Sequence, residues 1–333
     1  MSEFKALWVT EPDFNCQVIT RNIADLPAGE VLIRVKYSSL NYKDAISASG
    51  NRGVTRNYPH TPGIDAAGVV ASSSVDEFAA GDEVLVTGYD LGMDTAGGLA
   101  QYIRVPAGWV IKRPKGLSLR ETMILGTAGL TAALCVNKLL RAGLKPEDGE
   151  VLVTGATGGV GTVAVKLLSL LGYRVVAATG KGEQADFLRR LGAAEVIDRQ
   201  ELAAGTGRPM LKSRWAGAVD TVGGEILFNV IKSLNYGGSV ACCGLTAGTN
   251  FTGNVFPFIL RGVNLLGVDS VELPLVVKAS MWDMLSLQWK MDLEDLAEEI
   301  SLEQTPQAIS KILSGQHKGR LLVNIDGQAA ASA

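Results

Sequence analysis

Hydrophobic residues in the first third of the chain come in short runs, several of which alternate with polar residues. These runs cover Phe4–Val9, Val31–Val35, Ala66–Val70 and Glu83–Val86, and Gly, Pro, Asp and Ser separate them. A period of two places successive side chains on opposite faces of a strand, and the residues between the runs are typical of turns. The pattern therefore predicts a compact antiparallel barrel or sandwich.

Near residue 120 the pattern changes to strands that alternate with helices. The apolar run at 151–155 precedes apolar residues spaced by three and four positions from Val160 to Leu171, which form one face of a helix. Further strands are predicted at 174–179, 195–198, 218–223, 239–244 and 264–270, with helices at 183–191 and 225–234. This alternation predicts an α/β fold, a parallel sheet with helices on both faces.

The last part of the chain is expected to be mainly helical. Helices are expected at about 275–289, at 293–300 and near Pro306–Leu313, followed by a last strand in the segment RLLVNI. The tail GQAAASA has no bulky side chains and is expected to be disordered.

The length of 333 residues is too great for one ordinary domain and suits two.

The most specific motif is VLVTGATGGVG. Gly155, Gly158 and Gly161 fall at intervals of three, with Gly159 between them, where a predicted strand passes into an amphipathic helix. Glycines allow a sharp turn and a close approach of a pyrophosphate, and the helix N-terminus offers free N–H groups and a positive dipole end. This context favours a dinucleotide site over the alternative, an ordinary turn between a strand and a helix.

The residues after the second strand of this region indicate which dinucleotide. NAD sites usually carry Asp or Glu there, bound to the ribose hydroxyls. This chain has Thr179, Gly180 and Lys181 instead, and Arg199 follows the next strand. No carboxylate stands there to repel a 2′-phosphate, and the two cations can neutralise one, so NADP(H) is favoured over NAD(H). Solvated loop charges are the alternative for both cations.

Composition excludes several partners. The net charge is −3 and no basic cluster is present, so no nucleic acid is expected. The charged N-terminus lacks the apolar core of a signal peptide, and Lys166 interrupts the most apolar stretch, so we expect a cytoplasmic protein with no membrane span. Cys16, Cys135, Cys242 and Cys243 lack Cys-x-x-Cys spacing, so no structural zinc is expected, and the adjacent Cys242 and Cys243 are interpreted as small buried residues, with a redox role as the alternative.

Four further segments resemble the medium-chain dehydrogenase/reductase superfamily. They are SSLNYKDA (38–45), PGIDAAGVV (62–70), GGLAQYIRVPA (97–107) and FPFILRGVNLLGVDSV (256–271). These segments look like the acryloyl-CoA reductase branch of the quinone-reductase-like enzymes, and the match covers nearly the whole chain. The resemblance implies a GroES-like β-rich catalytic domain at 1–124 and 271–333, and a Rossmann domain with a doubly wound parallel sheet at 125–270.

The resemblance also implies that no metal takes part. Zinc-dependent alcohol dehydrogenases of this superfamily carry Cys where this chain has Asn41, and His-Glu where it has Ile64-Asp65. Isoleucine cannot ligate zinc, and the two histidines, His60 and His317, are expected at the surface. Zinc polarises an alcohol or carbonyl oxygen. Without it, hydride transfer suits a carbon that is already activated, as in acryloyl-CoA.

By resemblance, NADPH contacts more than the glycine turn. Tyr42 would lie beside the nicotinamide, and the residues at 157–160 would hold the pyrophosphate. Leu245, Ile259 and Ser270 would line the nicotinamide end, and Asn324 would close it. The complete set implied for the cofactor is Tyr42, Gly155, Thr157, Gly158, Gly159, Val160, Gly161, Thr179, Gly180, Lys181, Arg199, Leu245, Ile259, Ser270 and Asn324.

The candidate catalytic residues are Asn41, Tyr42, Asp44 and Asp65. Asn41 or Tyr42 would donate a hydrogen bond to the developing enolate oxygen, and Tyr42 is also a candidate to relay the proton. For Asp44 and Asp65 the alternative is a structural role as a helix cap or a turn-stabilising carboxylate.

These observations lead to one hypothesis and two alternatives. The hypothesis is NADPH-dependent reduction of the carbon–carbon double bond of acryloyl-CoA to propionyl-CoA. A quinone, alkenal or enone reductase with the same hydride chemistry is the alternative within the family, and a non-catalytic NADPH-binding protein is the alternative of another class. Arg52 and Arg56 would meet coenzyme A phosphates or remain solvated. The apolar strand at 264–270 is expected at the sheet edge and predicts a homodimer.

Overall fold

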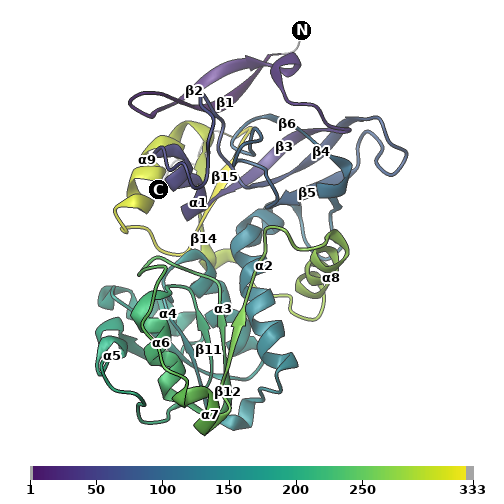
Figure 1. The fold of residues 1–333 in the computed structure, drawn as a ribbon. Coiled ribbons are helices and arrows are strands. Elements are labelled where there is room, and N and C mark those ends of the chain that lie inside the picture. The colour runs from purple at the N-terminus through teal and green to yellow at the C-terminus, as the bar shows by residue number, and fades with distance from the viewer. Residues whose placement is uncertain (1–2, 328–333) are drawn as a thin grey trace. The chain divides into compact units, whose positions relative to one another are not determined.

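The computed structural model describes residues 3–327, and the chain divides into two compact units (Figure 1). The first unit comprises the chain up to Thr127 and again from Ser270, and the second unit is Ala128–Asp269. The chain thus leaves the first unit once and returns to it. The end of the tail, from residue 328, lies outside the described residues, so the expectation of disorder there stays a prediction.

Antiparallel strands dominate the first unit, and the four strands predicted there are confirmed. A hairpin and a seven-stranded sheet of order β14-β15-β3-β4-β5-β7, with β6 also paired to β3, contain them. In β3, Val31, Ile33 and Val35 are buried while Arg34 is exposed, which is the expected alternation. The strands are β1 (Glu3–Thr10), β2 (Asn15–Asn22), β3 (Val31–Leu40), β4 (Asp65–Ser73), β5 (Glu83–Thr87), β6 (Tyr102–Val105), β7 (Ile111–Lys112), β14 (Ala297–Ser301) and β15 (Arg320–Asn324).

The helix predicted at 293–300 is wrong. A 3-10 turn, Glu294–Leu296, leads there into strand β14, which pairs in parallel with β15. Leu, Glu and Ala favour a helix locally, but pairing with a neighbouring strand outweighs that weak preference. The other predicted helices of this part are present as α8 (Leu275–Ser286) and α9 (Thr305–Leu313), and α1 (Tyr42–Ala48) was not foreseen.

The second unit contains a six-stranded sheet in which every pair is parallel. Its order, β10-β9-β8-β11-β12-β13, is that of a doubly wound dinucleotide-binding fold. The strands are β8 (Glu150–Val153), β9 (Arg174–Thr179), β10 (Glu195–Asp198), β11 (Trp215–Asp220), β12 (Leu234–Cys242) and β13 (Asn264–Gly267), and the helices are α3 (Gly159–Leu170), α4 (Ala185–Arg190), α5 (Arg199–Ala203), α6 (Gly224–Ser233) and α7 (Phe256–Arg261). The predicted α/β fold is confirmed.

Helix α2 (Leu119–Arg141) belongs to both units and is broken at Gly126, whose φ of 54° and ψ of −158° are not helical. By length and composition it is apolar enough to cross a membrane, although no such stretch was expected. However, 78% of its most apolar window is buried inside the protein, as in an ordinary core helix.

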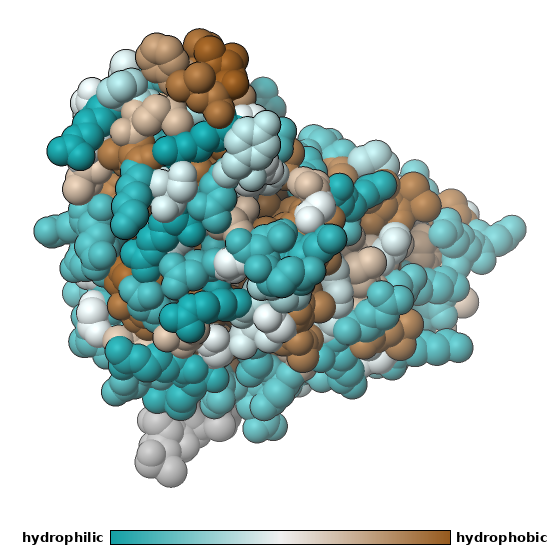
Figure 2. Space-filling model, turned by 90° about the horizontal axis from the view of Figure 1, so that it is seen from below, coloured by the Kyte–Doolittle hydropathy of each residue, from teal (hydrophilic) through white to brown (hydrophobic). Residues whose placement is uncertain are grey.

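Exposed hydrophobic side chains of the second unit concentrate on two neighbouring elements. Val255, Phe256, Ile259 and Leu260 lie at or on α7, and Leu265 lies on β13; each is at least 39% exposed. On the face that Figure 2 draws, hydrophobic side chains form separate groups among hydrophilic ones. Single exposed apolar residues are ordinary, but a group of five on adjoining elements suggests an interaction surface.

Candidate cofactor and active site

The glycine turn joins β8 to α3 at the carboxyl end of a central strand of the parallel sheet. Gly155 has a φ of +57°, and a β-carbon there would lie 2.3 Å from Thr221 Oγ1. A β-carbon on Gly161 would lie 2.3 Å from the Gly155 carbonyl oxygen. For Gly158 the nearest atom would be that same oxygen, at 3.3 Å. The turn itself therefore requires Gly155 and Gly161, whereas Gly158 leaves space free beside the backbone.

Two threonine hydroxyls join the glycine turn to the end of β9. Thr157 Oγ1 and Thr179 Oγ1 lie 3.1 Å apart, and Thr179 Oγ1 accepts a hydrogen bond from the Lys181 N–H at 3.0 Å. Arg199, the first residue of α5, covers Gly180, because a β-carbon on Gly180 would lie 2.6 Å from Arg199 Nε. The structure thus brings together five of the residues predicted around the adenosine phosphate and pyrophosphate.

The end of β9 carries two cations, Lys181 and Arg199, and two nearby carboxylates, Glu183 and Asp198. Burial lowers the pKa of Lys181, and the neighbouring Glu183 acts in the opposite direction. The Asp198 carboxylate caps α5 by accepting from the Gln200 N–H at 2.7 Å, which holds it to its own helix. These side chains fit a dinucleotide with an additional anionic group on its adenosine ribose.

Three of the candidate catalytic residues lie in a buried polar cluster of the first unit. Asp44 and Asp65 have no exposed surface and Asn41 is 9% exposed. Asp65 Oδ2 accepts hydrogen bonds from Ser39 Oγ at 2.5 Å and from Asn41 Nδ2 at 2.8 Å. Asp44 Oδ2 accepts from the Asn41 backbone N–H at 2.7 Å. The buried Arg320 donates to Asn41 Oδ1 at 3.0 Å.

The break in α2 completes this cluster. It directs the Thr127 N–H at Asp65, whose two carboxylate oxygens lie 3.0 and 2.9 Å from that nitrogen, and the Thr127 hydroxyl donates to Oδ1 at 2.5 Å. A β-carbon on Gly126 would lie 2.5 Å from both Asp65 Oδ2 and Ser39 Oγ, and 2.9 Å from Arg320 Nη2. Glycine at 126 therefore permits both the break and the close approach of α2.

The cluster holds two carboxyl groups and one guanidinium. Burial raises the pKa of Asp44 to about 7, and repulsion by Asp65 adds to this, while three hydrogen bonds from Asn41 and Ile64 act against it. Burial lowers the pKa of Arg320, and within the described residues its Nη2 has no hydrogen-bond partner. Near neutral pH a large share of molecules therefore carries a proton on Asp44.

These contacts separate the roles expected of Asn41 and Tyr42. The Asn41 amide is fully engaged, because Oδ1 accepts from Arg320 and Nδ2 donates to Asp65 and Asp44. The geometry therefore argues against Asn41 as a donor to an enolate oxygen. Tyr42, the first residue of α1, is 47% exposed and its hydroxyl remains a candidate.

The residues predicted at the nicotinamide end belong to different units. In the second unit, Leu245 follows β12 and Ile259 lies on α7, and they are 58% and 68% exposed. In the first unit Ser270 is buried, and the amide of Asn324 donates to Glu299 at 2.9 Å and accepts from the Gly327 N–H at 2.9 Å. Their common role stays a prediction.

Arg52 and Arg56 are exposed but already paired. Arg52 forms an ion pair with Glu11 and lies over the Tyr58 ring, and Arg56 Nε lies 2.8 Å from Asp94 Oδ2. A coenzyme A phosphate would have to compete with these carboxylates for either guanidinium.

Two cysteines and the two histidines were expected at particular depths, and the structure agrees with these expectations only in part. Cys242 and Cys243 are half-buried rather than fully buried as expected, and Cys135 is buried. Burial raises the pKa of Cys16 to about 12, which suits an unreactive thiol. His60 is buried rather than at the surface, because Nε2 pairs with the Gly92 carbonyl oxygen at 3.0 Å, and His317 is half-buried.

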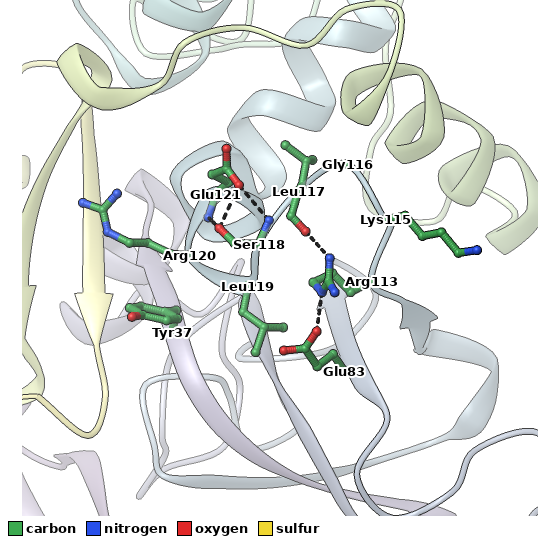
Figure 3. Close-up of a pocket in the computed structure, with 10 residues that line it drawn as sticks. All are labelled: Tyr37, Glu83, Arg113, Lys115, Gly116, Leu117, Ser118, Leu119, Arg120 and Glu121. Carbon is green, nitrogen blue, oxygen red and sulfur yellow. Dashed lines mark hydrogen bonds and ion pairs between the residues drawn. The ribbon is translucent and has the colours of Figure 1, made fainter.

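A cavity of about 540 Å³ in the first unit is lined by residues around the start of α2 (Figure 3). Arg113 pairs with Glu83 at 2.6 Å, Arg120 pairs with Glu299 at 2.9 Å, and Glu121 accepts a hydrogen bond from the Ser118 N–H at 2.7 Å. No predicted site residue lines it, so we do not assign it to the candidate site.

Sequence reasoning missed Gly126, Thr127 and Arg320. Two signals were available for them: a glycine inside the apolar helical segment MILGTAGL, and a single arginine at the start of the apolar strand RLLV. Neither signal identifies its partner, which lies elsewhere in the chain.

Two family models and several relatives match this chain. The alcohol dehydrogenase GroES-like domain matches residues 27–115 and the zinc-binding dehydrogenase domain matches residues 159–286. Bacillus subtilis YhfP, named as a quinone oxidoreductase, is 49% identical and covers 94% of this chain and 96% of its own. Escherichia coli AcuI, named as an acrylyl-CoA reductase, is 46% identical and covers 93% and 95%. The chain belongs to the medium-chain dehydrogenase/reductase superfamily.

Solved structures of the medium-chain dehydrogenase/reductase superfamily share the fold. E. coli YhdH with bound NADPH has a TM-score of 0.93 and 45% identity, and covers 96% of this chain and 100% of that chain. B. subtilis YhfP with bound NAD has a TM-score of 0.94 and 47% identity, and covers 98% and 100%. One of these two relatives was thus solved with NADPH and the other with NAD.

The zinc ion of many medium-chain dehydrogenase/reductase members does not fit these residues. Zinc takes Cys, His or carboxylate ligands. Asn41 presents an amide, Ile64 a buried hydrocarbon, and the oxygens of Asp65 are occupied by N–H and O–H donors. Across residues 3–327 no three His, Cys, Asp or Glu side chains are grouped as in a metal site. The name of the matching domain therefore does not extend to metal binding here.

Proposed function

We propose that this chain is an NADPH-dependent reductase that adds hydride to the activated carbon–carbon double bond of acryloyl-CoA and yields propionyl-CoA. The observation that carries the cofactor assignment is the arrangement at the end of β9, where Arg199 covers Gly180 beside Lys181. Two cations without an Asp or Glu at the end of this strand suit a 2′-phosphate, which NADPH carries and NADH lacks. The relationship to YhdH with NADPH supports this choice.

The second unit binds and orients the cofactor. The N–H groups at the start of α3 and the open face of Gly158 suit the pyrophosphate. When bound, NADPH supplies the hydride. The chain contributes orientation and the stabilisation of charge on the substrate oxygen.

The first unit supplies the candidate donor. Hydride addition at the β-carbon moves an electron pair toward the thioester oxygen, and a hydrogen bond from the exposed Tyr42 hydroxyl would stabilise that oxygen. A proton then reaches the α-carbon, from Tyr42 or from water. The buried cluster fixes Tyr42 through its neighbour, because Asp44 accepts from the Asn41 N–H at the start of α1. Asn41, Asp44 and Asp65 thus act on position rather than on the substrate.

Two alternative functions are compatible with the same cofactor site. A quinone or alkenal reductase is favoured by the name of YhfP, the relative with 49% identity. A non-catalytic NADPH-binding protein is compatible with the same glycine turn and the same cations. A cytoplasmic location is proposed with all three.

A steady-state assay separates these functions. NADPH oxidation is followed with acryloyl-CoA, crotonyl-CoA, a benzoquinone and a free enal, in the native chain and in Tyr42→Phe. We expect the highest kcat/KM for acryloyl-CoA and a loss of kcat in Tyr42→Phe. A higher kcat/KM for the quinone or the enal would identify the first alternative, and NADPH binding without any turnover the second.

A further inference from the structure

The parallel sheet reverses its direction of winding between two central strands. From β8 the chain proceeds outward to β9 and β10, and from β11 it proceeds the other way to β12 and β13. Dinucleotides bind outside the carboxyl ends of the strands at such a switch point. Val153 and Val219 pair in register, so the next residues, Thr154 and Asp220, stand side by side at this edge.

The Asp220 carboxylate connects the turns that leave these strands. Oδ1 accepts a hydrogen bond from Thr154 Oγ1 at 2.7 Å, and Oδ2 accepts from the Gly223 N–H at 2.8 Å. Its backbone oxygen accepts from the Cys243 N–H at 3.0 Å, after β12. Thr154 Oγ1 in turn accepts from the Thr221 N–H at 3.0 Å. One fully buried side chain therefore contacts the turn after β8 and the turn after β11.

The turns joined in this way are in direct contact. Thr221 Oγ1 donates to the Thr154 carbonyl oxygen at 2.8 Å, and a β-carbon on Gly155 would lie 2.3 Å from Thr221 Oγ1. A β-carbon on Gly244 would lie 1.9 Å from the Thr221 carbonyl oxygen. A displacement of the turn after β11 would therefore move Gly155, the first residue of the glycine turn.

We propose that Asp220 is a positioning residue, which acts through Thr154 to hold the glycine turn in the conformation that binds the dinucleotide. This inference rests on the proposed cofactor function and adds a residue pair that does not itself touch the cofactor. Burial makes a carboxylate costly here, and burial raises the pKa of Asp220. Each of its two oxygens accepts from a different turn, and an amide in its place would direct an N–H group at one of the two donors.

The test compares three variants for binding of NADPH and NADH and for thermal stability. Thr154→Val removes the hydroxyl at nearly constant volume, and Thr154→Ser keeps it. Thr305→Val is the matched control, because Thr305 is also buried and its hydroxyl donates to Leu302 O at 2.6 Å, in the first unit. We expect Thr154→Val to weaken both nucleotides by a similar factor of about ten, because it removes the hydrogen bond to Asp220 and leaves the Thr221 N–H without its acceptor. Thr154→Ser and Thr305→Val should bind as the native chain does.

The outcomes are distinguishable. Unchanged NADPH affinity in Thr154→Val, with a fall in melting temperature like that of Thr305→Val, would show a structural role only and overturn the proposal. If Thr154→Val does not fold, the same titration of Asp220→Asn decides, because an amide cannot accept from both Thr154 and Gly223. Failure of the native chain to bind either nucleotide would instead overturn the proposed function.

Discussion

Arg199 Nε lies 2.6 Å from the position that a β-carbon on Gly180 would occupy. The absence of a side chain at 180 thus allows the guanidinium to lie across the end of β9. Lys181 follows directly, and its backbone N–H is held by Thr179 Oγ1. The two cations therefore owe their common location to a glycine and a threonine, at a position where many dinucleotide-binding folds carry a carboxylate.

Lys181→Ala should distinguish between the two nucleotides. Loss of one charge-assisted contact to the 2′-phosphate should weaken NADPH by about 10- to 100-fold and leave NADH almost unchanged. Isothermal titration with both nucleotides measures the effect, and Lys212→Ala, an exposed lysine of the same unit, is the control for net charge. Equal losses for NADPH and NADH would contradict the assignment of a 2′-phosphate site.

Two valine substitutions in the glycine turn should fail for different reasons. Gly158→Val should fold, since its β-carbon would meet only the Gly155 carbonyl oxygen at 3.3 Å, but its branches would fill the space beside the turn and abolish binding of both nucleotides. Gly161→Val should not fold, because its β-carbon would lie 2.3 Å from that oxygen. Thermal melting and nucleotide titration separate the two effects. Normal NADPH binding by Gly158→Val would place the pyrophosphate elsewhere.

The parallel sheet could be predicted from sequence because its central strands are buried on both faces and appear as uninterrupted apolar runs, as at 175–178 in β9. Strand β14 could not, because residues 297–301 favour a helix locally and become a strand only by pairing with β15. The contacts of the buried cluster could not be predicted from sequence, for a related reason. Arg320 and Asn41 are 279 residues apart, and no local pattern reports so distant a partner. The sequence identified Asn41, Asp44 and Asp65 as site residues. It did not reveal their contacts, which are needed to decide whether these residues act in catalysis or in positioning.

Gly126→Ala should destabilise the protein severely. The substitution places a β-carbon 2.5 Å from Asp65 Oδ2 at a φ of +54°, in a cluster of buried charges, so we expect a loss of about 3–5 kcal/mol or failure to fold. Gly143→Ala is the control. It also has a positive φ, of +95°, but nothing lies within 4 Å of its β-carbon, so it should cost about 1 kcal/mol. Similar losses in urea denaturation would show that the cluster tolerates the intrusion.

Asp44 should make stability depend on pH in a defined direction. Burial raises its pKa to about 7 in the folded protein, above the value of about 3.9 for an unfolded chain. Its proton therefore stabilises the fold fully below about pH 4, and this contribution, on the order of 4 kcal/mol, is lost as the pH rises through 7. Melting temperatures of the native chain and Asp44→Asn between pH 4.5 and 8 should diverge in slope. The difference between the curves isolates Asp44 from other groups, such as His60, whose pKa burial lowers. Parallel curves would mean that Asp44 does not titrate in this range.

The homodimer prediction can be tested at the edge of the second unit's sheet. Strand β13 pairs with β12 on one side only, and Leu265 on it is 39% exposed beside the exposed apolar residues of α7. An open apolar edge is stabilised when a second copy pairs with it about a twofold axis. Light scattering should therefore give twice the chain mass of 35.1 kDa for the native protein. Leu265→Asp should give the monomer mass, because it would bury two charges at the axis, while Leu170→Asp, which changes a leucine 50% exposed on α3, should remain a dimer. A native chain that stays at the monomer mass at all concentrations would refute the homodimer.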